Sequence, residues 1–342
     1  MPTRVLSSAD VSVAVEAPAR LHMGFFDLNG SLGRKYGSLG LTLDGLSTCV
    51  VISRGDEASL SGAESERAQG YLNRLREVID LPVNICVSVR TAIPSHAGLG
   101  SGTQLALALG TAASRLTGSE LSPREIAHLL DRGARSGIGV AAFEHGGFVV
   151  DGGRGANDSL PPLIARLAFP PAWRILLLLD HAAAGLHGQL EISAFADLPP
   201  FPEADSQRLC RELLMRGLPA LAEADLACFG RAITDLQRTI GDYFAPAQGG
   251  RYASPRVAAA LDALSEGGVA CIGQSSWGPT GFAILASESD ARLWQARLAP
   301  EFSSLDLMIC NARNRGGETT VMAKAGSPHA RRGMLDRHGP NH

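Results

Sequence analysis

A glycine-rich stretch in the N-terminal half most strongly limits what this chain can fold into. It spells IPSHAGLGSGTQ over residues 93–104, between a run typical of a strand (83–93) and a run typical of a helix (105–116). Glycine lets the backbone turn sharply and lets a ligand approach without a Cβ in the way. The helix that follows begins with unpaired N–H groups and the positive end of its dipole, where phosphate or pyrophosphate binds. The stretch therefore predicts a phosphate-binding loop.

The spacing of this stretch separates it from two better-known phosphate motifs. It is neither the G-x-x-x-x-G-K-[ST] of a P-loop nor the G-x-G-x-x-G of a dinucleotide fold. A structural alternative stays open, in which the turn only caps the helix.

Length and composition bound the architecture. The 342 residues suffice for two domains with separate cores. The net charge of −3 indicates no broad basic surface for nucleic acid. The six cysteines show no C-x-x-C or zinc-site spacing, which indicates reduced thiols. With no secretory segment at the N-terminus and no apolar run long enough for a bilayer, we expect a cytoplasmic protein without a membrane partner.

Periodicity and turn signals predict an alternation of strands and helices. Strands are expected at 11–17, 39–52 (with a turn at Asp44-Gly45), 83–90, 147–151, 173–180, 269–274, 282–286 and 305–311. Helices are expected at 63–80, 102–116, 122–135, 205–241, 255–265 and 289–298. A composition shift near 154–171 divides the chain into domains at 1–165 and 166–324, and 325–342 is expected to be a disordered tail. The β, α, β, β, α, β order of the second half suits a ferredoxin-like layer.

Three polar residues lie in an otherwise apolar segment after the first strand: Arg20, His22 and Asp27. Each is as often a satisfied structural group as a functional one, but three together before a glycine-rich loop favour function. The loop, residues 29–40, carries Arg34 and Lys35 among four glycines. It could close over an anionic substrate or form a plain surface hairpin.

The glycine-rich stretch resembles the phosphate-binding motif of the GHMP kinase superfamily. Its Ser101-Gly102-Thr103-Gln104 version resembles one branch, the β-ribofuranosylaminobenzene 5′-phosphate synthases of methanopterin biosynthesis. Three further segments match that branch in order, at 20–34, 136–153 and 273–281. The resemblance implies an α+β fold with two domains: an N-terminal domain like domain 2 of ribosomal protein S5 and a ferredoxin-like C-terminal domain.

The resemblance also implies a reaction. A decarboxylating pentosyltransferase would join 5-phosphoribosyl 1-pyrophosphate to 4-aminobenzoate or 4-hydroxybenzoate, with release of pyrophosphate and CO2. It implies Mg²⁺ and no redox cofactor, small-molecule substrates as partners and, by analogy with the fold, a homodimer. Which of the two acids is the substrate stays open.

The residues suggest roles within that reaction. Candidate catalytic residues are Arg20, His22, Asp27, His96 and Glu144. Either histidine could accept a proton from the para substituent or bind the carboxylate, and either could be structural. Candidate metal ligands are Asp27 and Glu144, with Asp151 as a further carboxylate. Candidate substrate-binding residues are Arg34, Lys35, Pro94, Gly98, Leu99, Gly100, Ser101, Gly102, Thr103, Gln104, Ser275, Ser276 and Trp277. Trp277 could stack on the aromatic ring or cover the edge of the core.

Two other functions compete with the synthase. A small-molecule kinase of the same fold would use ATP, but Gly139 stands where many such kinases hold the Asp that orients the substrate hydroxyl. A non-catalytic binding protein on this scaffold would show an eroded phosphate loop, whereas residues 98–101 keep the motif.

Overall fold

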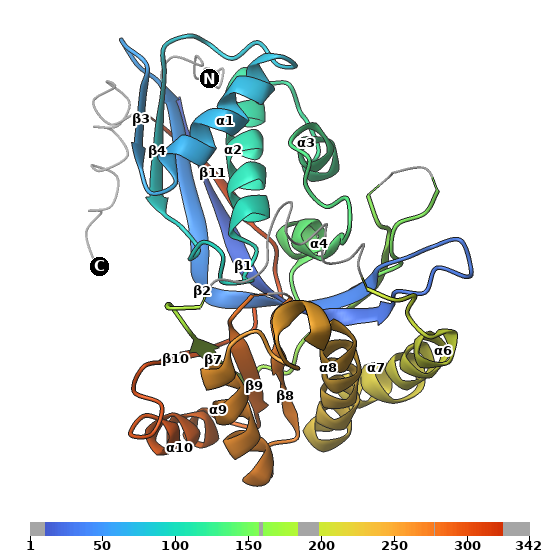
Figure 1. Cartoon of the computed structure of the whole chain (residues 1–342). Coiled ribbons are helices and arrows are strands. Elements are labelled where there is room, and N and C mark those ends of the chain that lie inside the picture. The colour runs from blue at the N-terminus through green and yellow to red at the C-terminus, as the bar shows by residue number, and fades with distance from the viewer. Residues whose placement is uncertain (1–10, 157–159, 184–197, 277, 324–342) are drawn as a thin grey trace, which may run out of the picture.

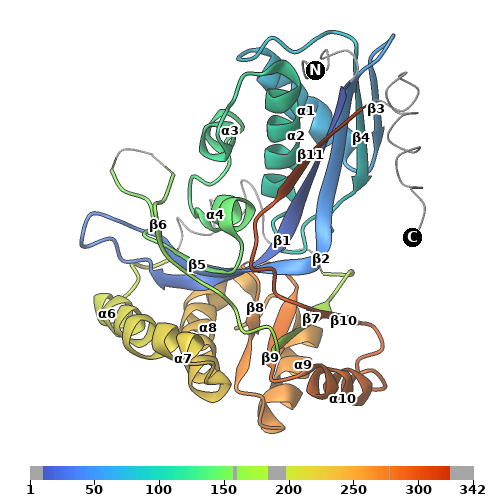
Figure 2. The same cartoon turned by 180° about the vertical axis from the view of Figure 1, so that it is seen from behind.

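The structure, a computed structural model, describes residues 11–156, 160–183, 198–276 and 278–323. Trp277 and the predicted tail at 325–342 lie outside these residues. Within the described part, two sheets lie one above the other, each covered by helices (Figures 1 and 2). None of the described helices has the length and apolar character needed to cross a membrane.

Among the described residues, seven strands form the N-terminal sheet, in the order β11-β1-β2-β4-β3, with β5 paired to β2 and β6 to β5. Its strands are β1 (Val11–Asp27), β2 (Gly37–Arg54), β3 (Ser59–Gly62), β4 (Ile85–Thr91), β5 (Phe148–Asp151), β6 (Leu163–Leu167) and β11 (Glu318–Ala323). The helices on one face are α1 (Ser65–Arg76), α2 (Ser101–Thr117), α3 (Pro123–Leu129) and α4 (Ile138–His145). Within the predicted helix at 122–135, α3 begins with a capping box that Ser122 and Glu125 form.

Strands β1 and β2 are longer than the sequence predicts. The Asp44-Gly45 pair forms no hairpin turn; it is a bend inside β2, where Gly45 has a φ of 84°. Irregularities in the ladder between Pro18 and Arg20 bend β1 at the same level. The lower halves of both strands therefore continue toward the second domain and carry Arg20 to Asp27 with them.

In the described C-terminal domain, four antiparallel strands lie in the order β10-β7-β9-β8. In chain order this is fourth-first-third-second, the ferredoxin-like arrangement that the sequence predicts. The strands are β7 (Arg174–Leu179), β8 (Cys271–Gln274), β9 (Gly281–Leu285) and β10 (Asp306–Cys310). The helical elements are α6 (Glu203–Glu212), a π-helical turn (Leu213–Gly217), α7 (Leu218–Ala222), α8 (Leu226–Gln248), α9 (Pro255–Glu266) and α10 (Glu288–Leu298).

Both faces of the C-terminal sheet are buried. Along β7, Leu176 and Leu178 pack with α9 and α10, whereas Ile175 and Leu177 belong to the core shared with α8 and the N-terminal domain. The ring of Phe148 on β5 lies 5.6 Å from that of Phe229 on α8. One continuous apolar core thus fixes the two domains relative to each other, which matters because the candidate site lies between them.

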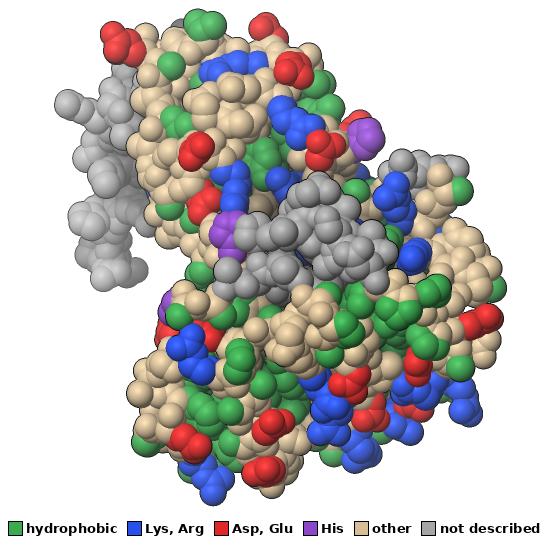
Figure 3. Space-filling view, in the orientation of Figure 1, with side chains coloured by type: hydrophobic (Ala, Val, Ile, Leu, Met, Phe, Trp, Pro, Cys, Tyr) green, Lys and Arg blue, Asp and Glu red, His purple; other side chains and the backbone are tan. Residues whose placement is uncertain are grey.

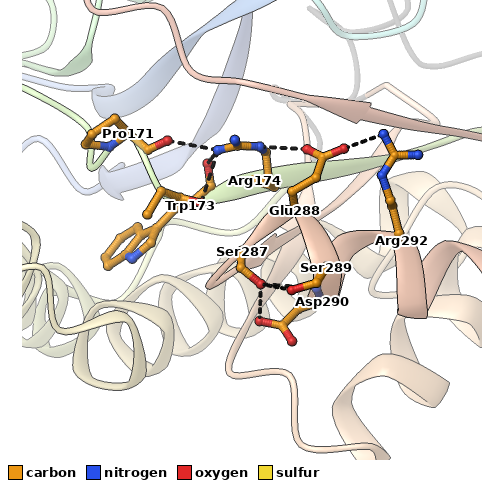
Figure 4. A network of polar contacts seen from close by, with 9 residues as sticks. Pro171, Trp173, Arg174, Ser287, Glu288, Ser289, Asp290 and Arg292 are labelled. Atoms are coloured by element: carbon orange, nitrogen blue, oxygen red, sulfur yellow. Dashed lines mark hydrogen bonds and ion pairs between the residues drawn. The ribbon is translucent and has the colours of Figure 1, made fainter.

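A polar network anchors α10 at the start of β7 (Figure 4). The Arg174 side chain donates to the Glu288 carboxylate (2.8 Å) and to the Pro171 carbonyl (2.8 Å). Arg292, one turn along α10, pairs with the other oxygen of Glu288 at 2.7 Å. This network fixes the outer helix and lies apart from the domain junction.

The chain crosses between the domains more often than the predicted division at 165/166 implies. That division falls inside β6, which pairs with β5 in the N-terminal sheet. The last described strand, β11, was assigned by sequence to the C-terminal domain but pairs with β1. Composition does not indicate that the chain returns to the N-terminal sheet, because β11 is a short edge strand and its partner β1 lies about 300 residues earlier in the sequence.

Candidate active site

The glycine-rich stretch forms a tight loop between β4 and α2. Three of its residues have left-handed backbone conformations, with φ of 60° at His96, 78° at Gly98 and 88° at Gly100. No side chain caps α2 and its first turn holds no acidic residue. The N–H groups of Ser101, Gly102 and Thr103 donate to no other described residue. The start of α2 is therefore an open, electropositive end that suits an anion.

The loop is held in place by both domains. The carbonyl of Gly98 accepts hydrogen bonds from Arg20 Nη1 (2.6 Å) and Ser275 Oγ (2.7 Å). Ser275 Oγ in turn accepts from the N–H of His22 at 3.0 Å. A Cβ at Gly98 would lie 2.4 Å from the Ser275 carbonyl oxygen, so only glycine allows this approach. The orientation of the peptide after Gly98 is thus set by β1 and by the turn after β8.

His22 is buried below the loop and is neutral. Burial, then the charges of Arg20 and Arg135, lowers the pKa of His22 to about 3. Its Nδ1 accepts from the N–H of Gly24 at 3.3 Å, which places the proton on Nε2. Nε2 is buried and has no hydrogen-bond partner among the described residues. A neutral His22 with its proton on Nε2 can donate a hydrogen bond to a ligand. This role is favoured over that of proton acceptor, which the sequence left open.

A cavity of about 700 Å³ lies between the β1–β2 connection and the segment before α6. Its lining residues Ala134 and Arg135 follow closely on Arg132, whose guanidinium lies near Gly102 of the loop. The cavity wall carries three basic side chains, Lys35, Arg135 and Arg154, and the phenols of Tyr36 and Tyr243. The remaining wall is formed by Leu28, Asn29, Ala134, Leu198, Pro199, Pro200 and Phe201. Lys and Arg side chains are visible near the junction of the two halves in Figure 3. The cavity suits an anionic ligand with an aromatic part.

Both halves of the chain match known domains. Residues 66–147 match the GHMP kinases N terminal domain, and residues 218–303 match the GHMP kinases C terminal domain. The fold is that of the homoserine kinase from Cytophaga hutchinsonii, with a TM-score of 0.67 over 94% of this chain and 100% of that one, at 18% identity.

Two archaeal proteins are similar over nearly the whole chain. The β-ribofuranosylphenol 5′-phosphate synthase of Methanothermobacter thermautotrophicus is 31% identical over 328 residues, 90% of this chain and 98% of its own. The protein of the same name from Archaeoglobus fulgidus is 35% identical over 321 residues, 90% of this chain and 99% of its own. The chain belongs to the β-ribofuranosylphenol 5′-phosphate synthase family. This confirms the branch of the GHMP superfamily that the four sequence segments indicate.

In this synthase-family chain the predicted loop residues lie together, but with different environments. Leu99 and Gln104 are fully buried, and Gln104 Nε2 donates to the Gly139 carbonyl at 2.8 Å, so Gln104 joins α2 to α4. Pro94 is half-buried and His96 is exposed at the outer end of the loop. The N–H of Ser276 donates to the His22 carbonyl at 2.9 Å, which places this residue beside the loop, and Trp277 lies outside the described residues.

The predicted basic residues of the 29–40 loop divide between two roles. Lys35 lines the cavity. The guanidinium of Arg34 donates to the carbonyls of Gly152 (2.7 Å) and Gly153 (2.6 Å) and braces the turn after β5.

Two further basic residues of the cavity, Arg135 and Arg154, are not among the residues that the sequence predicts for the site. Each comes one residue before or after a recognised segment, at 136–153, and this adjacency was the signal that could have found them.

The two predicted metal ligands of this synthase-family chain do not form a ligand set. Asp27 lies beside the cavity, where its Oδ1 accepts from the N–H of Asn29 and from Ser206 Oγ, both at 2.9 Å. Glu144 lies at the end of α4, with Arg124 at 3.5 Å and His145 at 3.8 Å. The carboxylates share no partner, and the described residues contain no group of three His, Cys, Asp or Glu side chains that could hold a metal ion.

Asp151, the third candidate carboxylate, is structural. It is buried and accepts five hydrogen bonds: from the N–H groups of Ser38, Gly137 and Gly153 and from the hydroxyls of Ser38 and Ser136. Burial raises the pKa of Asp151, and these donors act in the opposite direction. With both oxygens occupied, its role is to join β2, the start of α4 and the turn after β5.

Proposed function

We propose that this chain transfers a 5-phosphoribosyl group from 5-phosphoribosyl 1-pyrophosphate to the ring of an aromatic acid, with loss of pyrophosphate and CO2, in methanopterin biosynthesis. One observation carries the proposal: an open helix N-terminus lies beside a separate cationic cavity. The ribosyl donor has the matching form, because it carries a diphosphate at one end and a phosphate at the other. The names of the full-length relatives support the same product class.

In this proposal the diphosphate binds at the start of α2, beside Arg20, and the 5-phosphate binds near Lys35 and Arg154. His22 supports this arrangement, because Arg20, which donates to the loop, and Arg135, which lines the cavity, are both near enough to lower its pKa. The reacting ribose carbon would lie in the same region.

The chemistry follows from where charge develops. The bond between ribose C1 and the pyrophosphate oxygen breaks, and the electron pair leaves with the pyrophosphate. The N–H groups of α2 and the guanidinium of Arg20 stabilise that growing negative charge. The ring carbon that bears the carboxylate attacks C1, and the C–CO2 bond then breaks, returning its electron pair to the ring. The apolar part of the cavity wall, which includes Leu28, Leu198 and Phe201, favours this last step by removing water from the carboxylate.

The acceptor that we propose is 4-hydroxybenzoate, because the relatives are named for a ribofuranosylphenol product. Tyr36, Phe201 and Tyr243 give the cavity an aromatic wall on which such a ring can pack. Mg²⁺ remains part of the proposal only as an ion that arrives on the diphosphate, with phosphate oxygens and waters as ligands. No protein carboxylate is assigned to it.

The test is an assay for release of pyrophosphate and CO2. It uses 5-phosphoribosyl 1-pyrophosphate, Mg²⁺ and carboxyl-labelled 4-hydroxybenzoate, with 4-aminobenzoate in parallel. We expect both products in equal amounts, with the hydroxy acid preferred. Release of neither product, together with phosphate transfer from ATP to a small alcohol, would replace the synthase by a kinase.

A variant at the loop locates the reaction. Gly100→Asp places a carboxylate where Arg20 lies 3.3 Å from the new Cβ and where φ is 88°, so it repels the diphosphate and strains the loop. Gly118→Asp is the matched control at the far end of the same helix, with φ of 76° and no atom within 4 Å of its Cβ. We expect product release to be lost only in Gly100→Asp. Equal loss in both variants would mean that helix stability, and not the loop, is the cause.

A further inference from the structure

We infer that Arg132 is an anion-binding residue of this site and that it holds the diphosphate from the side of α2 opposite Arg20. The inference rests on the proposed function and adds to it a source of positive charge within the protein. It follows from the mismatch described above, because the implied metal has no carboxylate ligand set at the loop.

The position of Arg132 is fixed by contacts with the first turn of α2. A Cβ built on Gly102 would lie 3.8 Å from Arg132 Nη1 and 3.7 Å from the Tyr71 hydroxyl. Tyr71 donates to the Gly102 carbonyl at 3.1 Å. The Arg132 guanidinium lies over the Tyr71 ring, 5.3 Å from its centroid. Tyr71 therefore acts as a platform that holds the guanidinium beside the unpaired N–H groups of the helix.

Among the described residues, no carboxylate compensates the charge of Arg132. Its Nε is buried and has no hydrogen-bond partner, and no ion pair joins it to a carboxylate in the described part of the chain. The adjacent carboxylate, Asp131, pairs with Arg74 and not with Arg132. Burying part of a guanidinium without a partner is unfavourable. An anionic ligand at the start of α2 removes that cost.

The charges around this position point to a multiply charged ligand. Arg20 lies on one side of the loop, where its guanidinium carbon is 3.3 Å from a Cβ built on Gly100, and Arg132 lies beside Gly102. The first turn of α2 carries no acidic residue. Two arginines beside the same helix N-terminus suit a diphosphate better than a single carboxylate.

The experiment measures binding of inorganic pyrophosphate to the full chain by calorimetry, in EDTA and in Mg²⁺. We expect wild type to bind pyrophosphate in EDTA, and Arg132→Gln to raise the Kd at least about tenfold, because a charge-assisted hydrogen bond is lost. The dependence of Kd on salt should also become shallower. Arg132→Lys keeps the charge but not the planar fork, and should lie between the two.

Arg74→Gln is the matched control. It removes an arginine whose partner is the residue adjacent to Arg132, on the exposed side of α1, and should leave the Kd unchanged. Pyrophosphate binding in Arg132→Gln or in Arg132→Lys equal to wild type would overturn the inference, as would a wild type that binds only with Mg²⁺. If Arg132→Gln does not fold, Arg132→Lys decides alone. Arg132-dependent binding without CO2 release would overturn the proposed function and leave this inference intact.

Discussion

Gly139 lies directly against Thr103. A Cβ built on Gly139 would be 3.0 Å from Thr103 Cγ2 and 3.4 Å from its Cβ. Many kinases of the superfamily have an aspartate at the place of Gly139, and here the side chain of Thr103 from α2 takes up part of the space that a carboxylate would need. The identity of residue 103 in the phosphate loop is therefore coupled, through packing, to the absence of a carboxylate at position 139.

This coupling predicts a non-additive pair of substitutions. Gly139→Asp should lower the free energy of unfolding by about 1–2 kcal/mol, because its carboxyl group overpacks against Thr103. In a Thr103→Ala background the same change should be close to neutral, since α4 gains an acidic residue in its first turn. Urea unfolding of the four proteins of the cycle measures the coupling. Additive effects would show that Thr103 does not restrict this position.

The hydroxyl of Ser275 links the two domains at the loop. Ser275→Ala leaves the N–H of His22 without its buried acceptor and removes one donor from the Gly98 carbonyl. We expect a loss of about 1–3 kcal/mol in the free energy of unfolding. Ser276→Ala is the control, because no side-chain hydrogen bond of Ser276 joins it to another described residue. Equal unfolding free energies for the two variants would contradict the role of Ser275.

His22 predicts a specific dependence of stability on pH. Its folded-state pKa of about 3 lies below the ordinary value of 6.5, so the unfolded chain binds a proton that the folded chain excludes. Its contribution is fully present above pH 6.5 and is lost as the pH falls toward 3. Between these limits, wild type should lose about 1.4 kcal/mol per pH unit more than His22→Asn. Urea unfolding at pH 7, 6 and 5 tests this, and parallel curves would show that His22 titrates normally.

Arg313 fixes the returning strand β11. It is 3% exposed and pairs with Glu16 at 2.7 Å and Glu318 at 3.0 Å. Because these carboxylates are partly solvated, we expect Arg313→Ala to cost about 2–3 kcal/mol, less than a fully buried pair. Arg315→Ala removes an exposed arginine that also pairs with Glu318, and should cost less than about 1 kcal/mol. Similar losses in the two variants, measured by urea unfolding, would mean that burial of Arg313 adds nothing.

Local sequence determined the elements whose signals are local. The phosphate loop follows from its three glycines, the start of α3 from Ser122 and Glu125, and the C-terminal sheet order from the succession of strands and helices. These features depend on backbone freedom, capping and periodicity, which act within a few residues. The four matching segments were enough to identify the family for the same reason, since each is a short motif.

Tertiary structure alone decided which distant residues meet. Arg132 carries no motif and Arg135 and Arg154 only flank one; they reach the site because α3 and α4 pack against α2 and because the chain after β5 lines the cavity. Burial keeps His22 neutral, and hydrogen bonds occupy both carboxylate oxygens of Asp151. The residue type alone shows neither effect. Whether a side chain is charged, and whether its polar atoms already have hydrogen-bond partners, depends on solvation and on residues far apart in the chain. Sequence therefore placed the loop, and packing decided which charged groups surround it.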